Sequence, residues 1–159
     1  TAIKNFGSAV VVDFNLLDLF LGRRVGGIGT TCGLALVIGA IYLMFRGFIR
    51  WEIVFSFLAS IVVFTTIFRI LDPINYVGPA FHLLSGYTLF GAFFLATEDS
   101  SSPVNFIPMM LYGALGGLMT ILIRNLGAYV DGVIFAILIA NICSPLLDKI
   151  RPTPLGKAV

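Results

Sequence analysis

Residues 103–123 read PVNFIPMMLYGALGGLMTILI, an unbroken stretch of 21 residues without a charged side chain. A helix needs about 20 predominantly apolar residues to cross the hydrocarbon core of a bilayer. Four similar runs lie at residues 27–45, 51–68, 79–97 and 130–147. Backbone amides in lipid can be satisfied only within helices or closed barrels, and the alternating pattern of barrel strands is absent. We therefore expect an all-α integral membrane protein with about five transmembrane helices.

The composition of the whole chain agrees with a membrane protein. Of its 159 residues 58% are hydrophobic and 11% charged, with a mean hydropathy of +1.03, well outside the usage of soluble domains. The net charge of +2 is too small and dispersed to indicate nucleic acid as a partner. One histidine and two cysteines exclude a zinc or iron–sulfur cage within this chain, because such cages need three or four ligands. Cys32 and Cys143 lie in apolar runs, where buried thiols are favoured over a disulfide.

The connections between the runs carry signals for helix ends. Arg46 and Gly47 predict a helix end with a left-handed glycine. Ser102 is expected to cap the fourth helix with Pro103 at its first position, and Asp131 to begin the fifth. Residues 16–22 are apolar but too short to span, which suggests a re-entrant or interfacial stretch.

The expected organisation has three parts. Residues 1–26 form an extramembrane or re-entrant segment, 27–148 the transmembrane domain, and 149–159 a short basic tail. The first residue is not a methionine, so we expect a piece of a longer protein.

Glycines spaced four residues apart occur at Gly29/Gly33 and Gly113/Gly117. Small residues at this spacing let two helix backbones approach closely, and tight helix packing is the favoured interpretation. Close approach of the backbone to a flat cofactor is the alternative.

Four ionisable residues are candidates for an ion path, because polar groups at membrane depth need a partner, a cavity or a ligand. His82 could relay a proton or hydrogen-bond a cofactor, and helix-end capping or a neutral buried hydrogen bond is its simpler role. Glu98 could gather a cation or lie in a solvated loop. Asp131 is expected to pair with Arg124. Asp148 follows Pro145, whose missing amide frees a carbonyl that could bind a cation or simply kinks the helix near its end.

Glycines and hydroxyls gather just after Arg23 and Arg24. Gly27, Gly29, Thr30 and Thr31 offer amides and hydroxyls at the expected start of a helix, the groups that bind an anionic phosphate. The spacing matches neither the Rossmann nor the P-loop motif, so nucleotide binding of those types is not predicted.

Two stretches resemble the signature of the RnfD/NqrB family of membrane subunits, namely residues 16–22 (LLDLFLG) and 26–35 (GGIGTTCGLA). The resemblance continues through three later stretches, at 81–86 (FHLLSG), 127–138 (GAYVDGVIFAIL) and 141–148 (NICSPLLD). The short tail that follows Asp148 is similar to the RnfD branch.

The resemblance implies the C-terminal half of a ten-helix, urea-transporter-like protein that carries covalent FMN. The flavin would be attached at Thr1 or just upstream, with riboflavin as a further flavin, and Gly27, Gly29, Thr30 and Thr31 would be its neighbours. Thr30 replaces a glutamate of the family, which puts an ion path through that position in doubt. Asp148 matches a family aspartate suited to ion uptake.

The function implied is that of an electron-relay subunit in a ferredoxin:NAD⁺ type complex that translocates Na⁺ or H⁺. Its partners would be the other subunits and the lipid of a bacterial or archaeal inner membrane. The resemblance places Asp148 near the cytoplasm, although the basic residues are equally divided between the two sides. A urea-transporter-like channel without a cofactor and a purely structural subunit are the alternatives.

Overall fold

The computed structural model describes residues 16–23, 29–73, 76–98, 101–126 and 131–150, which contain helices and turns and no strand. The expected all-α class is therefore confirmed. In chain order the elements are α2 (Leu16–Leu21), α3 (Gly33–Phe45), α4 (Trp51–Leu71), α5 (Pro79–Leu84), α6 (Thr88–Phe90), the π-helix η2 (Gly91–Leu95), α7 (Phe106–Leu126), α8 (Val133–Leu147) and the 3₁₀-helix η3 (Asp148–Ile150).

Three stretches within the described residues are long and apolar enough to cross a membrane: Trp51–Leu71, Phe106–Leu126 and Val133–Ile150. They correspond to the second, fourth and fifth predicted runs. The fourth run begins its helix at Phe106, so the expected capping by Ser102 and Pro103 is wrong. The first run begins its helix only at Gly33, and its 13 helical residues span about 20 Å, less than a bilayer core.

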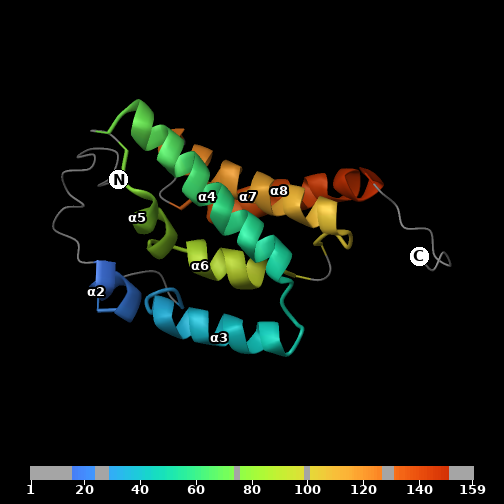
Figure 1. Cartoon of the computed structure of the whole chain (residues 1–159), viewed down its shortest axis with the longest axis horizontal. Coiled ribbons are helices and arrows are strands. Elements are labelled where there is room, and N and C mark those ends of the chain that lie inside the picture. The colour runs from blue at the N-terminus through green and yellow to red at the C-terminus, as the bar shows by residue number, and fades with distance from the viewer. Residues whose placement is uncertain (1–15, 24–28, 74–75, 99–100, 127–130, 151–159) are drawn as a thin grey trace.

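Helices α4 and α7 lie side by side and parallel, and α8 returns antiparallel to α7 (Figure 1). A Cβ at Gly113 would lie 2.7 Å from the carbonyl oxygen of Ile53, and one at Gly117 would lie 2.6 Å from that of Phe57. The hydroxyl of Ser60 donates to the carbonyl of Ala114 across the same seam, at 2.7 Å. The predicted packing role of the Gly113/Gly117 pair is therefore confirmed.

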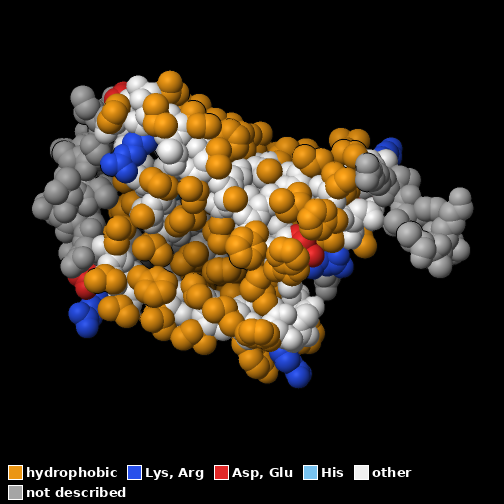
Figure 2. All heavy atoms as spheres, in the orientation of Figure 1, with side chains coloured by type: hydrophobic (Ala, Val, Ile, Leu, Met, Phe, Trp, Pro, Cys, Tyr) orange, Lys and Arg blue, Asp and Glu red, His pale blue; other side chains and the backbone are white. Residues whose placement is uncertain are grey.

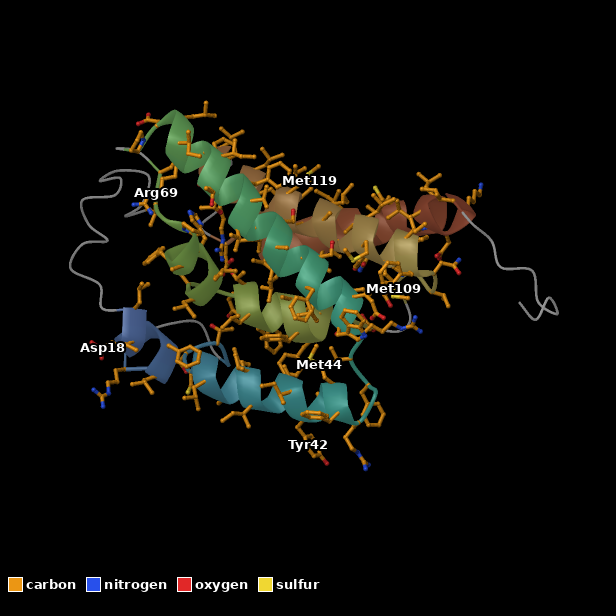
Figure 3. The ribbon with its side chains drawn as sticks, in the orientation of Figure 1. Asp18, Tyr42, Met44, Arg69, Met109 and Met119 are labelled. Atoms are coloured by element: carbon orange, nitrogen blue, oxygen red, sulfur yellow. The ribbon has the colours of Figure 1, made fainter. Side chains whose placement is uncertain are left out.

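Helix α3 forms a second layer against α6 and η2 (Figure 1). Met44 points from α3 toward that neighbour, whereas Tyr42 points away (Figure 3). Gly47 has a φ of +76°, and the amides of Gly47 and Phe48 donate to the carbonyls of Met44 and Leu43. These two bonds make a Schellman motif, so the predicted glycine-terminated helix end is confirmed.

The third predicted run is not a continuous helix. Helix α5 ends at Leu84, the backbone turns through Gly86 at a φ of +65°, and α6 with η2 then runs in a new direction (Figure 1). The side chain of Arg69, at the end of α4, reaches the start of α5 (Figure 3). A Cβ on Gly78 would lie 2.7 Å from Nη1 of Arg69. The turn at Gly86 interrupts an apolar run, and non-helical backbone at membrane depth must face protein or water.

The face seen in Figure 2 is covered mainly by hydrophobic side chains, and the charged side chains lie at its margins. Large apolar side chains are exposed on several helices, with Phe45 at 88% and Ile142 at 76%. An apolar surface of this extent is compatible with lipid or with other membrane protein as its surroundings.

Candidate functional site

The buried guanidinium of Arg124, near the end of α7, bonds the end of α5. Its Nη1 donates to the carbonyl of His82 at 2.9 Å, and its Nη2 donates to the carbonyl of Ser85 at 3.1 Å. The last carbonyls of a helix have no partner within the helix and carry a partial negative charge. Arg124 therefore caps α5 from another part of the chain.

Asp131, which precedes α8, completes this site. One carboxylate oxygen accepts a bond from Arg124 Nη2 at 2.8 Å, and the other accepts from the amide of Tyr87 at 2.8 Å. The hydroxyl of Thr88 donates to the carbonyls of His82 and Ser85 at 2.8 and 3.0 Å. The predicted Arg124–Asp131 ion pair is confirmed, but Asp131 does not cap α8, whose N-cap is Gly132.

The residue His82 is 2% exposed, and neither nitrogen of its imidazole ring has a hydrogen-bond partner among the described residues. Within the same part of the chain Arg124 Nε and Asn125 Nδ2 also lack one. Buried polar atoms without partners are costly, and water, an ion or another molecule commonly supplies them. The side chain of His82 caps no helix here, because the bonds at the end of α5 are made by its main-chain carbonyl.

A second polar site lies at the other end of α8. A cavity of about 340 Å³ is lined by Ser101, Ser102, Asn141, Ser144, Pro145 and Asp148. Its side chains offer hydroxyl, amide and carboxylate oxygens, the ligands that hard cations prefer. Pro145 has no amide hydrogen, so the Asn141 carbonyl lacks its usual helical partner.

The four ion-path candidates divide between these two sites. His82 and Asp131 lie at the start of α8, and Asp148 directly follows its end; α8 itself is 15 residues or roughly 22 Å long. Glu98 is exposed, and its main-chain carbonyl accepts bonds from Ser101 and Ser102 on the cavity side. The structure therefore does not bring the four into one cluster.

The glycine and hydroxyl cluster is only partly described, since Thr1 and Gly27 lie outside the described residues. Gly29 has a φ of +80° with open space where a Cβ would lie, and Thr31 is exposed. Both precede α3, whose N-cap is Cys32. Exposed glycine and threonine residues before a helix N-terminus fit the chemistry of a phosphate group.

Sequence reasoning missed the role of three residues, Ser85, Tyr87 and Thr88. Their functional atoms are two main-chain groups and one hydroxyl, which carry no charge pattern. The dipeptide Ser85-Gly86 was the available signal, because glycine and serine often mark turns.

Comparison with known proteins gives the chain a family. The model of the NQR2, RnfD, RnfE family matches residues 1–156. The RnfD subunit of the ion-translocating oxidoreductase complex of Erwinia tasmaniensis is 44% identical over 125 residues, which cover 78% of this chain and 35% of that protein. The corresponding subunits from Cronobacter sakazakii and Escherichia coli O7:K1 are 41% and 38% identical over 85% and 87% of this chain.

The matched region is 39% of the length of the Cronobacter protein and 40% of the Escherichia protein, so this chain spans about two fifths of such relatives. The match extends over nearly all of the sequence, and the described residues have the helical, apolar architecture expected of a membrane protein. This chain belongs to the NQR2, RnfD, RnfE family.

Proposed function

We infer that this chain belongs to an electron-relay subunit that carries FMN and couples electron transfer to the movement of Na⁺ or H⁺. The observation that carries the inference is the family match over residues 1–156. The proposed setting is a multi-pass subunit of a bacterial or archaeal inner membrane. Its partners there are the other subunits of a ferredoxin:NAD⁺ type complex.

The described residues near α3 support a flavin phosphate as the ligand. Gly29 leaves open space, and the hydroxyls of Thr30 and Thr31 precede a 13-residue helix whose N-terminus favours negative charge. When bound, FMN would supply one-electron redox chemistry, while the chain binds and orients it. Thr1 or a residue upstream would hold it covalently, and riboflavin is a further flavin compatible with the family.

The two polar sites at the ends of α8 support ion movement. Asp131 and Asp148 place a carboxylate at either end of an apolar helix, and the second of them borders an oxygen-lined cavity. Ionisable side chains that face the interior of a membrane protein commonly mark proton or ion pathways. We assign ion entry or exit to the Asp148 cavity and an internal relay to the His82 region.

Flavin fluorescence of the full-length subunit tests the function. The complex is purified, denatured and separated by gel electrophoresis, and the subunit band is expected to fluoresce because a covalent flavin survives denaturation. The control is a variant in which Thr1 and the threonines just upstream of it are replaced by valine. A dark band, together with uptake of a small neutral solute by vesicles, would instead support the channel alternative.

A further inference from the structure

The break after α5 is held in part from outside its own segment. Apolar residues continue on both sides of Ser85-Gly86, so the local sequence permits a continuous helix. Besides the hydroxyl of Thr88, the bonds at this junction come from Arg124 and Asp131, which lie 39 to 44 residues later in the chain.

The two charges are divided between the two helix ends. The cation of Arg124 lies at the carbonyl end of α5, and the anion of Asp131 lies at the first amide of the segment that follows. Each charge thereby opposes the partial charge of the helix end that it meets. Their side chains are only 6% and 22% exposed, so solvent screens the pair little.

We propose that Arg124 and Asp131 are positioning residues that hold α5 and α6 apart and thereby fix His82 in the ion path. The inference rests on the proposed function, which supplies the ion path. The carbonyl of His82 is held by both Arg124 and the hydroxyl of Thr88, so the residue is anchored at the junction. Its ring nitrogens have no partner within the described residues, which leaves them for a proton or the water of a transported ion.

Gly86 gives an independent way to disturb the same geometry. A Cβ at this position would lie 2.5 Å from Asp131 Oδ2 and 2.8 Å from Arg124 Nη2, and the φ of +65° disfavours any other L-residue. The substitution Gly86→Ala therefore displaces both charged groups without removing either.

The test uses the complete complex in sealed vesicles and measures ions moved per electron transferred, with the assembled subunit quantified. We expect Asp131→Leu and Gly86→Ala to lower this ratio about threefold or more, a typical effect for residues of a coupled element, while electron transfer continues. Asp131→Asn should retain more of the ratio, because its amide oxygen still accepts a bond from Tyr87. Asp18→Asn is the matched control, since its partner Arg23 is 3.8 Å away and largely exposed.

A merely structural pair would lower the amount of assembled complex and leave the ratio unchanged, which would overturn the inference. A restored ratio in the double variant Arg124→Asp with Asp131→Arg would also overturn it, because the exchanged charges would face the wrong helix ends. If the complex with Asp131→Leu does not assemble, the ions moved per electron are compared between Gly86→Ala and Asp131→Asn. A lower ratio in Gly86→Ala supports the inference, and equal ratios overturn it. A wild-type complex that transfers electrons without moving ions would contradict the proposed function itself.

Discussion

At the scale of single residues, Asp148 has the simplest chemistry to test. Its carboxylate borders the oxygen-lined cavity and accepts a bond of 3.3 Å from the amide of Val104. Apart from Asp148, the side chains that line this cavity are uncharged. Its negative charge would therefore be the main electrostatic attraction for a cation in this cavity.

We expect Asp148→Asn to raise the Na⁺ concentration needed for half-maximal turnover about tenfold, the effect of losing one charged interaction of about 1.4 kcal/mol. The measurement is turnover of the full complex against Na⁺ concentration. Glu52→Gln, which removes another half-buried carboxylate that does not line the cavity, should leave the curve in place. An unchanged Na⁺ dependence in Asp148→Asn would exclude the cavity from Na⁺ uptake.

At the scale of elements, the seam between α4 and α7 depends on the absence of side chains. A Cβ at Gly117 would lie 2.6 Å from the Phe57 carbonyl and 2.7 Å from the Ser60 Cβ, and backbone cannot rotate away. At Gly39 on α3 the nearest atom to a Cβ is 3.9 Å away, on the Phe94 ring. Replacing each of these two glycines by alanine is therefore expected to have opposite effects on stability.

Gly117→Ala is expected to destabilise the protein by about 1–3 kcal/mol through overpacking. Gly39→Ala should be neutral or stabilising by up to about 1 kcal/mol, because alanine is the better helix former. The midpoint of thermal unfolding in detergent compares the two variants. Equal midpoints would mean that α4 and α7 do not pack as closely as the structure indicates.

The element scale also shows where sequence reasoning succeeds and where it stops. The Gly113/Gly117 spacing predicts the close seam, because both glycines recur on one helix face. Hydropathy does not predict the break at Gly86, because it averages over residues adjacent in the sequence. Bonds at this break come from Arg124 and Asp131, which are distant in the sequence. The ion pair between those two was predictable because only seven positions separate them in the sequence, but its bonds to α5 and Tyr87 depend on tertiary structure.

At the scale of the whole molecule, the exposed surface determines whether water or lipid surrounds the protein. Apolar side chains such as Phe45, Ile70 and Ile142 are more than 70% exposed on three different helices. Water would not solvate such a surface, whereas lipid or neighbouring membrane protein would cover it.

We expect the full-length protein to stay with the membrane after an alkaline carbonate wash and to be released only by detergent. A peripheral protein bound through charges would be released by the wash. Recovery of the polypeptide in the detergent-free supernatant would contradict the membrane fold on which the functional proposal depends.

The shortness of α3 has an electrical consequence. A helix of about 20 Å is matched poorly by a hydrocarbon layer of about 30 Å, so the layer beside it is thinned locally or replaced by protein. The membrane voltage is then dropped over a shorter distance there than elsewhere in the bilayer. A charge that crosses beside α3 would experience a steeper field and need a shorter route to traverse the full potential.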